Sequence, residues 1–271
     1  MVSGDLLDNG APEVLVLRDT DATLDTDRLV LPGGGSADVF AEDDQTLVQV
    51  TAGHPDGVEI LRSVLTSPAL QVHGDVLDVV VVGGGGWDRW VLSGDLEHRW
   101  LFSRHWEHRP DTAAVVTVVG HSPGDDETTP RGAPTAGPAL ATATRLVHDT
   151  VGPPGTLHVV TLVTRRGGPV AGGVSDRRPD PGVVGAALDE SDVVVASWGP
   201  VEQGMSDAVA DTVEELRVRR DEGTRVLVRS VDGTIETSGT PPQPGNAPTV
   251  GRDTRLVDAP AEWLWGGELV S

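Results

Sequence analysis

The residues best equipped for chemistry lie in one segment, His121-Ser122-Pro123-Gly124-Asp125-Asp126-Glu127. It follows a run of valines that predicts a buried strand, so it would lie where that strand ends. The imidazole of His121 could act as a general base, and the carboxylate of Asp125 could orient a water molecule or hold a hard cation. We take both as candidate catalytic residues. A solvated acidic loop in an acidic protein remains the alternative.

Arg104 is a candidate ligand contact because it is followed closely by Trp106 and preceded by Trp100. Alternate residues of a strand share one face, so a strand here would place Arg104 beside both rings. An arginine stacked between aromatic side chains can bind a base or a phosphate. A structural arginine paired with one of the many carboxylates is the alternative.

Two other patterns bear on ligands. His105 and His108 would point to opposite faces of a strand and lack the helical spacing of a zinc motif, so no metal site is predicted. Arginine pairs at 165–166 and 177–178 stand out in a chain this acidic, and Arg166 is a candidate anion contact. Salt bridges to nearby acids would explain these pairs equally well.

These residues need elements to position them. Valine-rich runs at 113–119, 156–163 and 192–198 predict strands buried on both faces. Helical periodicity at 137–149 and 207–220 lies between or after them. Strands alternating with helices predict a parallel sheet, whose ligands usually bind at the carboxyl ends of the strands.

The N-terminal part differs. Short strands are predicted at 14–17, 28–31 and 46–50, with a helix at 58–65. Four glycines at 83–86 lack the Gly-Lys pair of a phosphate loop and predict a turn between two strands.

The expected fold is therefore α/β: a three-layer domain with a mainly parallel sheet, preceded by a smaller β-rich N-terminal module. The predicted boundaries are residues 1–88 for the N-terminal module, 89–257 for the α/β domain and 258–271 for a C-terminal tail.

The composition indicates a habitat. The chain has twenty arginines and no lysine against 42 acidic residues, for a formal net charge of −22. Concentrated salt screens the resulting repulsion, so the composition is typical of salt-in halophiles such as haloarchaea. Without cysteine there is no disulfide and no thiolate metal site. No secretory signal and no apolar run of membrane-spanning length are visible, so we expect a soluble, cytoplasmic protein without a membrane partner.

Several short motifs from residue 99 onward occur in an order found in one protein family. In chain order they are Arg99-Trp100-Leu101-Phe102-Ser103-Arg104-His105-Trp106, Gly120-His121-Ser122-Pro123, Val160-Thr161-Leu162, Trp198-Gly199, Gly239-Thr240-Pro241-Pro242-Gln243-Pro244 and Asp253-Thr254-Arg255-Leu256-Val257. With them, residues 89–257 resemble the domain-of-unknown-function 1643 family, as a divergent haloarchaeal-type member. The resemblance implies ligand-binding roles for Thr161, Arg166, Trp198 and Gln243; packing at the end of the third valine-rich strand is the alternative for Trp198.

This chain departs from the family pattern at polar positions. The family has Asn where this chain has Gly120 or His121, Asn at Thr161, and His at Gln243. The family's order of parts is also loosely similar to that of uracil-DNA glycosylases, which bind an extruded base at the strand ends. A likeness at that level carries little weight for function.

Two functional hypotheses remain. In the first, this is a non-catalytic or degenerate domain that acts through binding or protein contacts, and the replaced polar residues favour it. In the second, it is a nucleotide- or base-binding enzyme of glycosylase-like architecture that uses the loops after the first three valine-rich strands. The sequence identifies no cofactor; the partners it favours are a small anionic ligand or nucleotide, or another protein.

Overall fold

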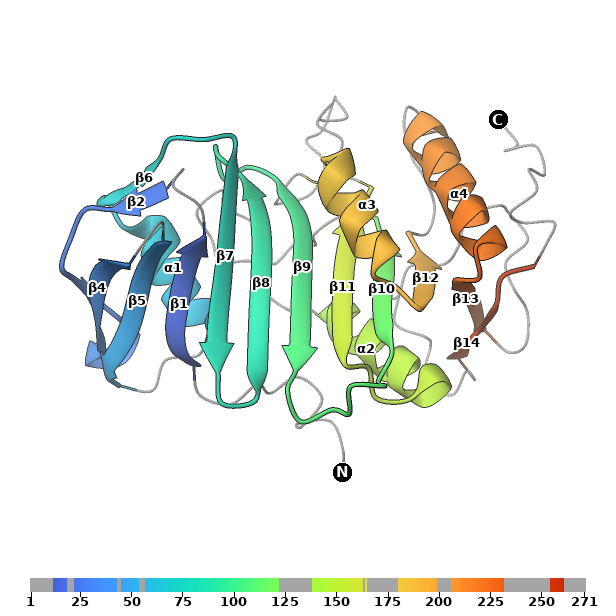
Figure 1. The fold of residues 1–271 in the computed structure, drawn as a ribbon, viewed down its shortest axis with the longest axis horizontal. Helices are drawn as coiled ribbons and strands as arrows, with labels where there is room; N and C mark the ends of the chain where they lie inside the picture. Colours follow the sequence, from blue (N-terminus) through green and yellow to red (C-terminus); the bar gives the residue numbers. More distant parts are fainter. Residues whose placement is uncertain are drawn as a thin grey trace.

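The fold is built around one long sheet. The computed structural model describes residues 12–18, 22–42, 45–53, 57–121, 138–162, 164, 180–198, 206–231 and 254–260. In this part of the chain, twelve strands form a mixed sheet in the order β14-β13-β12-β10-β11-β9-β8-β7-β1-β5-β4-β3, and β2 and β6 form a separate pair (Figure 1).

The strands are β1 (Pro12–Arg18), β2 (Ala22–Leu24), β3 (Arg28–Val30), β4 (Ser36–Glu42), β5 (Gln45–Ala52), β6 (Leu70–Val72), β7 (Val76–Gly83), β8 (Gly86–Ser93), β9 (Arg99–Trp106), β10 (Val115–Gly120), β11 (Thr156–Thr161), β12 (Val193–Ser197), β13 (Arg225–Val231) and β14 (Thr254–Asp258). The helices are η1 (Pro32–Gly34), α1 (Gly57–Thr66), α2 (Pro138–Val151), α3 (Pro181–Asp189) and α4 (Ser206–Asp221).

The antiparallel part of the sheet runs from β3 to β9. Each of its neighbouring strand pairs is antiparallel. Alternate residues of β1, such as Leu15 and Leu17, are fully buried and join Ile60 and Leu61 of α1 in one core cluster. Alternate side chains of β1 therefore point to the same face of the sheet, where they pack against the apolar side of α1.

The parallel part of the sheet contains the three predicted valine-rich strands. β10 pairs in parallel with β11 on one side and with β12 on the other, and β12 pairs in parallel with β13. Val118 belongs to the core cluster that includes Leu146 of α2, whereas its neighbour Val119 belongs to the cluster that includes Leu188 of α3 and Leu216 of α4. Since neighbouring strand residues face opposite sides, α2 covers one face of this part and α3 and α4 cover the other.

The predicted fold class is wrong for the molecule. Three of the eleven pairings in the large sheet are parallel, so the sheet is mixed and mainly antiparallel, and the protein is mainly β rather than a three-layer α/β domain with a mainly parallel sheet. The difference arises where β9 pairs antiparallel with β11. This pairing adds the N-terminal strands to the same sheet, and β8 crosses the predicted boundary at residue 88 without a break.

Three helices lie where the sequence predicts them: α1, α2 and α4. α3 is missing from the prediction, although Asp180 caps it and Pro181 occupies its first turn. Its two glycines weaken the helical signal. Among the described helices, none has the length and apolar character needed to cross a membrane.

Candidate functional site

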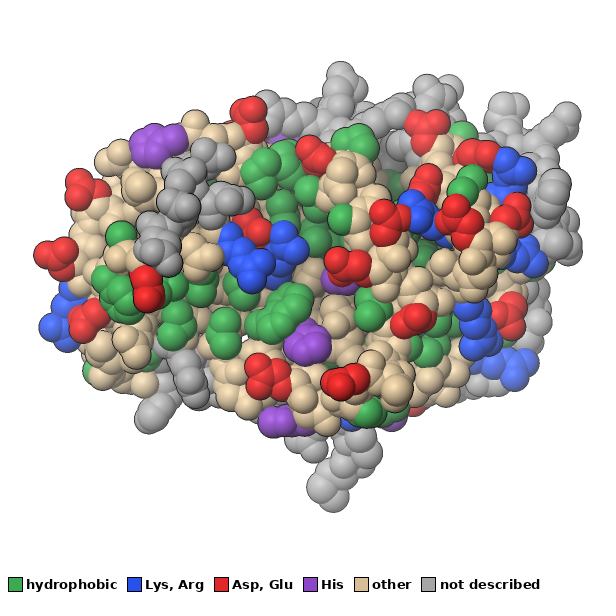
Figure 2. Space-filling model, viewed as in Figure 1, with side chains coloured by type: hydrophobic (Ala, Val, Ile, Leu, Met, Phe, Trp, Pro, Cys, Tyr) green, Lys and Arg blue, Asp and Glu red, His purple; other side chains and the backbone are tan. Residues whose placement is uncertain are grey.

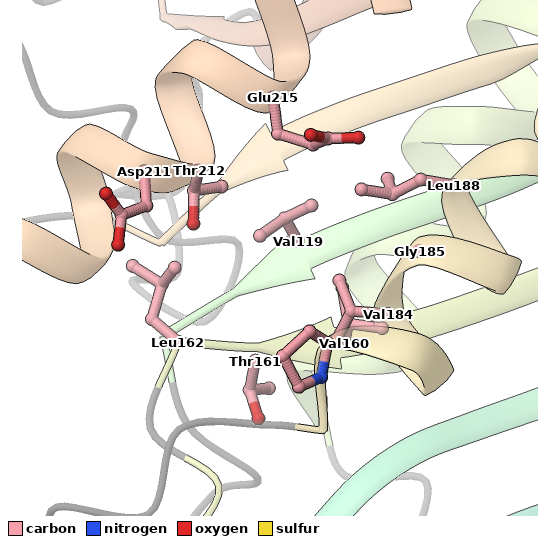
Figure 3. A pocket seen from close by; sticks show the side chains of 11 residues that line it. Val119, Val160, Thr161, Leu162, Val184, Gly185, Leu188, Asp211, Thr212 and Glu215 are labelled. Carbon is pink, nitrogen blue, oxygen red and sulfur yellow. The ribbon is translucent and has the colours of Figure 1, made fainter.

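A pocket of about 320 Å³ opens between α3, α4 and the sheet (Figure 3). It lies over the carboxyl ends of β10 and β11, the edge at which parallel strands usually present ligand sites. Its lining consists of Val119, Val160, Thr161, Leu162, Pro181, Val184, Gly185, Leu188, Asp211, Thr212 and Glu215.

The floor of the pocket is apolar. Val119 of β10 and Val160 of β11 are adjacent across the parallel pair, and Leu162 follows two residues after Val160 on the same face. All three are less than a tenth exposed and belong to the core cluster beneath α3 and α4. A ligand lying on this floor would contact hydrocarbon.

The α3 wall owes its space to a glycine. The carboxylate of Asp180 accepts hydrogen bonds from the backbone N–H groups of Gly182 (2.8 Å) and Val183 (3.3 Å), which fixes the start of the helix. One turn later, Gly185 lines the pocket, and a Cβ built on it would meet no atom within 4 Å. The absent side chain therefore leaves part of the volume open.

The α4 wall carries the polar side chains of the lining apart from Thr161. All three polar residues of this wall, Asp211, Thr212 and Glu215, come from α4, and Glu215 points toward Leu188 of α3 (Figure 3). Asp211 and Glu215 are four residues apart and so share one side of the helix. Leu216 beside them is fully buried. The pocket thus has an apolar floor and one acidic wall.

Arg219 joins α3 and α4 next to the lining residue Glu215. Its guanidinium contacts Glu215 (2.8 Å from Nη2 to Oε1) and Asp189 at the end of α3, so it links the two helices. The hydrogen bond to Glu215 raises the pKa of Arg219, which stays charged. Asp211 and Leu162 lie on the side of the pocket opposite Leu188 (Figure 3).

Among the predicted site residues that the structure describes, one lines the pocket. Thr161 contributes to the lining, but its hydroxyl is buried without a hydrogen-bond partner and points away from the other lining side chains (Figure 3). Trp198 is fully buried in the core beneath α3 and α4. His121 is partly buried directly after β10. The predicted site residues Asp125, Arg166 and Gln243 lie outside the described residues.

Arg104 occupies a different environment from the expected aromatic clamp. It forms a bidentate ion pair with Asp88, with Nε–Oδ1 and Nη2–Oδ2 distances of 2.7 and 2.6 Å. A register shift between β8 and β9 places Trp100 in the core cluster under α3 and α4, whereas Trp106 packs on the α2 side. The strand face therefore changes between the two tryptophans, and the Arg104 guanidinium pairs with a carboxylate instead of lying between both rings.

One group among the described residues has the chemistry of a metal site. Ligand atoms of Asp95, Glu97 and His98 lie within 4.8 Å of one another in the turn between β8 and β9. The Asp95 carboxylate already accepts hydrogen bonds from the Ser93 hydroxyl and the Glu97 backbone N–H. His105, a histidine considered for a metal site from the sequence, stacks on Trp87, with ring centroids 5.3 Å apart.

Sequence reasoning overlooked the acidic wall and the glycine opposite it. The sequence carried a weak signal for the wall: Glu215 directly precedes the apolar Leu216, and Asp211 lies one turn before Glu215 on the same side of the helix. Gly185 had no such signal, because its role depends on α4 lying opposite.

A polar row was overlooked as well. Thr161 of β11 and Ser197 of β12 both pair with Gly120, and Arg229 of β13 lies one residue beyond the paired Val228. All three side chains are more than nine-tenths buried. They lie at the carboxyl ends of the parallel strands, on the α2 side, since Leu227 packs there and Arg229 is two residues further along β13.

Comparison with protein families, with curated proteins and with solved structures found no match for this chain. The resemblance to the domain-of-unknown-function 1643 family therefore stays an expectation from the motifs.

Proposed function

We propose that the protein is a non-catalytic binding protein that holds a small molecule with an apolar body in the pocket between α3 and α4. The observation that carries the proposal is the pocket itself: an open space of about 320 Å³ on an apolar floor, at the carboxyl ends of β10 and β11. Ligand pockets of proteins begin at about 300 Å³ and combine apolar walls with a few polar groups.

The lining supports recognition rather than chemistry. Its polar side chains within the described residues, apart from Thr161, are two carboxylates and one hydroxyl, all from α4. Such a set can orient one end of a ligand while the floor contacts the other end. His121, the proposed general base, is absent from this lining.

The test uses Gly185, because its side chain position opens into the pocket. Gly185→Leu should fill the space, and Gly185→Ala is the matched control that leaves most of it open. A panel of small apolar compounds is titrated into each protein in concentrated KCl, with binding followed by calorimetry. We expect binding to the wild type and to Gly185→Ala, and none to Gly185→Leu. Equal binding to all three proteins would contradict the proposal.

The polar row at the strand ends favours a second candidate, a nucleotide- or base-binding enzyme. Thr161 of this row is buried on the α2 side at the carboxyl end of β11. The Thr161 hydroxyl lacks a hydrogen-bond partner, and a ligand could satisfy it.

Thr161→Val separates this candidate from the first. It keeps the shape of the side chain and removes only the unpaired hydroxyl. Nucleotide binding that is lost in Thr161→Val but retained in Gly185→Leu would favour the enzyme hypothesis. The absence of nucleotide binding to the wild type would exclude it.

A further inference from the structure

We propose that two copies of this chain form a symmetric dimer by stacking the face of their antiparallel strands that lies opposite α1. This face spans six neighbouring strands, β4, β5, β1, β7, β8 and β9. It is separate from the pocket between α3 and α4, which lies over β10 and β11. The dimer therefore goes beyond the proposed function and does not depend on it.

Six apolar side chains form two cross-strand rows on this face. The backbone pairings place Val14, Val82 and Trp87 in the first row and Phe40, Leu47 and Val16 in the second. Phe40 is 41% exposed, and the other five are partly buried. Apolar side chains gather over β4 to β8 on this side of the molecule (Figure 2). A contiguous apolar surface of this kind is typical of an interaction site.

No described helix covers the two rows. Leu15 and Val81 alternate with them along β1 and β7 and belong to the core cluster that contains residues of α1, so the rows lie on the opposite face. α3 and α4 cover the parallel strands instead (Figure 1). None of the six apolar side chains belongs to a core cluster of the described residues. A second molecule would bury them as the centre of an interface.

The face is large enough for a stable dimer. Six strands that are about 4.8 Å apart and about six residues long have a footprint of roughly 600 Å². A dimer would bury this area on each copy, about 1,200 Å² in total, which is the lower limit for a stable and specific interface.

The groups at the two ends of the first row indicate that the partner is a second copy. On the β4 side the row reaches Asp38, an exposed acid whose neighbour on β3, Arg28, donates to Ser36 instead. On the β9 side it reaches His105, which pairs with Trp87. A two-fold axis that runs along the strands between β1 and β7 exchanges the two sides. Asp38 of one copy then faces His105 of the other, and the imidazole can donate a hydrogen bond to the carboxylate.

The same axis also matches the apolar centre of the face. Val14 pairs with Val82 and Val16 pairs with Val80 across the junction of β1 and β7, so the axis places valine over valine in the second copy. The interface then has an apolar centre and polar margins, as stable interfaces do. Because a two-fold interface uses one surface twice, this self-complementarity favours a second copy over a different protein.

Sedimentation equilibrium in about 1 M KCl measures the association, because this salt screens the repulsion between two chains of net charge −22. The wild type should be mostly dimeric at about 100 µM, as expected for a Kd in the micromolar range. Val16→Glu should raise the Kd at least about tenfold, because two carboxylates then lose water at the apolar centre. Val218→Glu is the matched control: it makes the same change at a valine of α4 that is 40% exposed and outside this face, and it should leave the Kd unchanged.

Exchanging the groups at the margins tests the two-fold arrangement. Asp38→Arg and His105→Asp should each raise the Kd by up to about fivefold, the range of an exposed ion pair. The double variant Asp38→Arg, His105→Asp should restore the wild-type Kd, because opposite charges again face each other. Within one copy the two residues lie five strand spacings apart, roughly 24 Å, so this recovery can arise only between copies. The margin variants test the interface even if Val16→Glu lowers the stability of the fold.

A wild type that stays monomeric at about 100 µM would overturn the inference. So would a dimer that Val16→Glu leaves intact, or one that Val218→Glu weakens equally, because the loss would then reflect overall charge. A dimer that both single margin variants weaken, without recovery in the double variant, would contradict the two-fold axis along the strands.

Discussion

Nδ1 of His158 on β11 lies 2.7 Å from the hydroxyl oxygen of Ser103 on the neighbouring strand β9, with both side chains buried. On its other side, Nε2 of His158 lies 3.4 Å from the carboxylate of Glu190, just after α3. The order serine, histidine, carboxylate is that of a hydrolytic triad. However, Ser103 is 0% exposed in the middle of β9, so no substrate reaches its hydroxyl. The contacts of His158 with Ser103 and Glu190 instead connect the sheet to the end of α3.

This arrangement predicts a pH dependence of stability. Burial lowers the pKa of His158 from 6.5; Glu190 opposes the shift, and Arg89 adds to it. The unfolded chain therefore binds more protons than the folded chain as pH falls below about 6.5, so the free energy of unfolding should fall there. The contribution of neutral His158 to the free energy of unfolding is complete above this pH and is lost progressively on acidification. Urea unfolding at a series of pH values measures it.

His158→Gln should flatten that dependence, because glutamine does not titrate and can still hydrogen-bond to Ser103. His148→Gln, at a more exposed histidine on α2, is the matched control. An unchanged pH slope in His158→Gln would show that this imidazole is not the group responsible.

The ion pair between Asp88 and Arg104 predicts a large effect of single substitutions. Both side chains are nearly buried, and the pair is bidentate. Asp88→Asn should reduce the free energy of unfolding by about 3 kcal/mol, because it leaves a buried guanidinium without its counter-charge. The double variant Asp88→Leu, Arg104→Met should lose less free energy of unfolding than the sum of the losses in Asp88→Leu and Arg104→Met measured separately. Additive losses in urea unfolding would argue against a coupled pair.

Two glycines should respond to alanine with opposite signs. Gly86 begins β8 with φ of 145°, and an added Cβ would lie 1.9 Å from the carbonyl oxygen of His105. Gly86→Ala should therefore destabilise the protein by about 2 kcal/mol or more. Gly185→Ala, within α3 and facing open space, should stabilise it by up to about 1 kcal/mol. Thermal unfolding of the two variants under one condition tests both signs, and a stable Gly86→Ala would be incompatible with the turn described.

The net charge of −22 predicts that stability increases with salt. Raising KCl from 0.1 M to 1 M shortens the screening length from about 10 to about 3 Å, so repulsion within the folded chain should weaken. Unfolding by urea at each KCl concentration measures the effect. Replacing the exposed acids Asp38 and Glu42 by their amides should reduce the salt dependence. A wild type equally stable in dilute buffer would contradict the halophilic interpretation of the composition.

Local patterns predicted local structure well. The valine runs of β10, β11 and β12 are buried parallel neighbours because β-branched side chains of this density need cover on both faces. The expected helix at 207–220 is α4, and Leu216 is buried, but Val218 is 40% exposed. Periodicity thus identified the helix and misplaced part of its packed side.

Features that depend on distant pairings could not be predicted. The pairing of β9 with β11 joins the two parts of the sheet, and nothing in either strand specifies that partner over another. The register shift opposite Val91 and Leu92 changes which face of β9 Trp100 occupies, and a strict period of two cannot anticipate it. The pocket could not be predicted either, because α3 and α4 lie opposite each other only after the order of the strands in the sheet is fixed.

The place of β11 in the sheet has a consequence for the nascent chain. β9 and β10 follow each other in sequence and run in opposite directions, yet in the finished sheet β11 separates them. Until residue 161 has left the ribosome, the open edge of β9 can form a hairpin with β10, and β11 must then displace it. Synthesis of the segment between β10 and β11 therefore sets the interval in which a wrongly paired intermediate can accumulate.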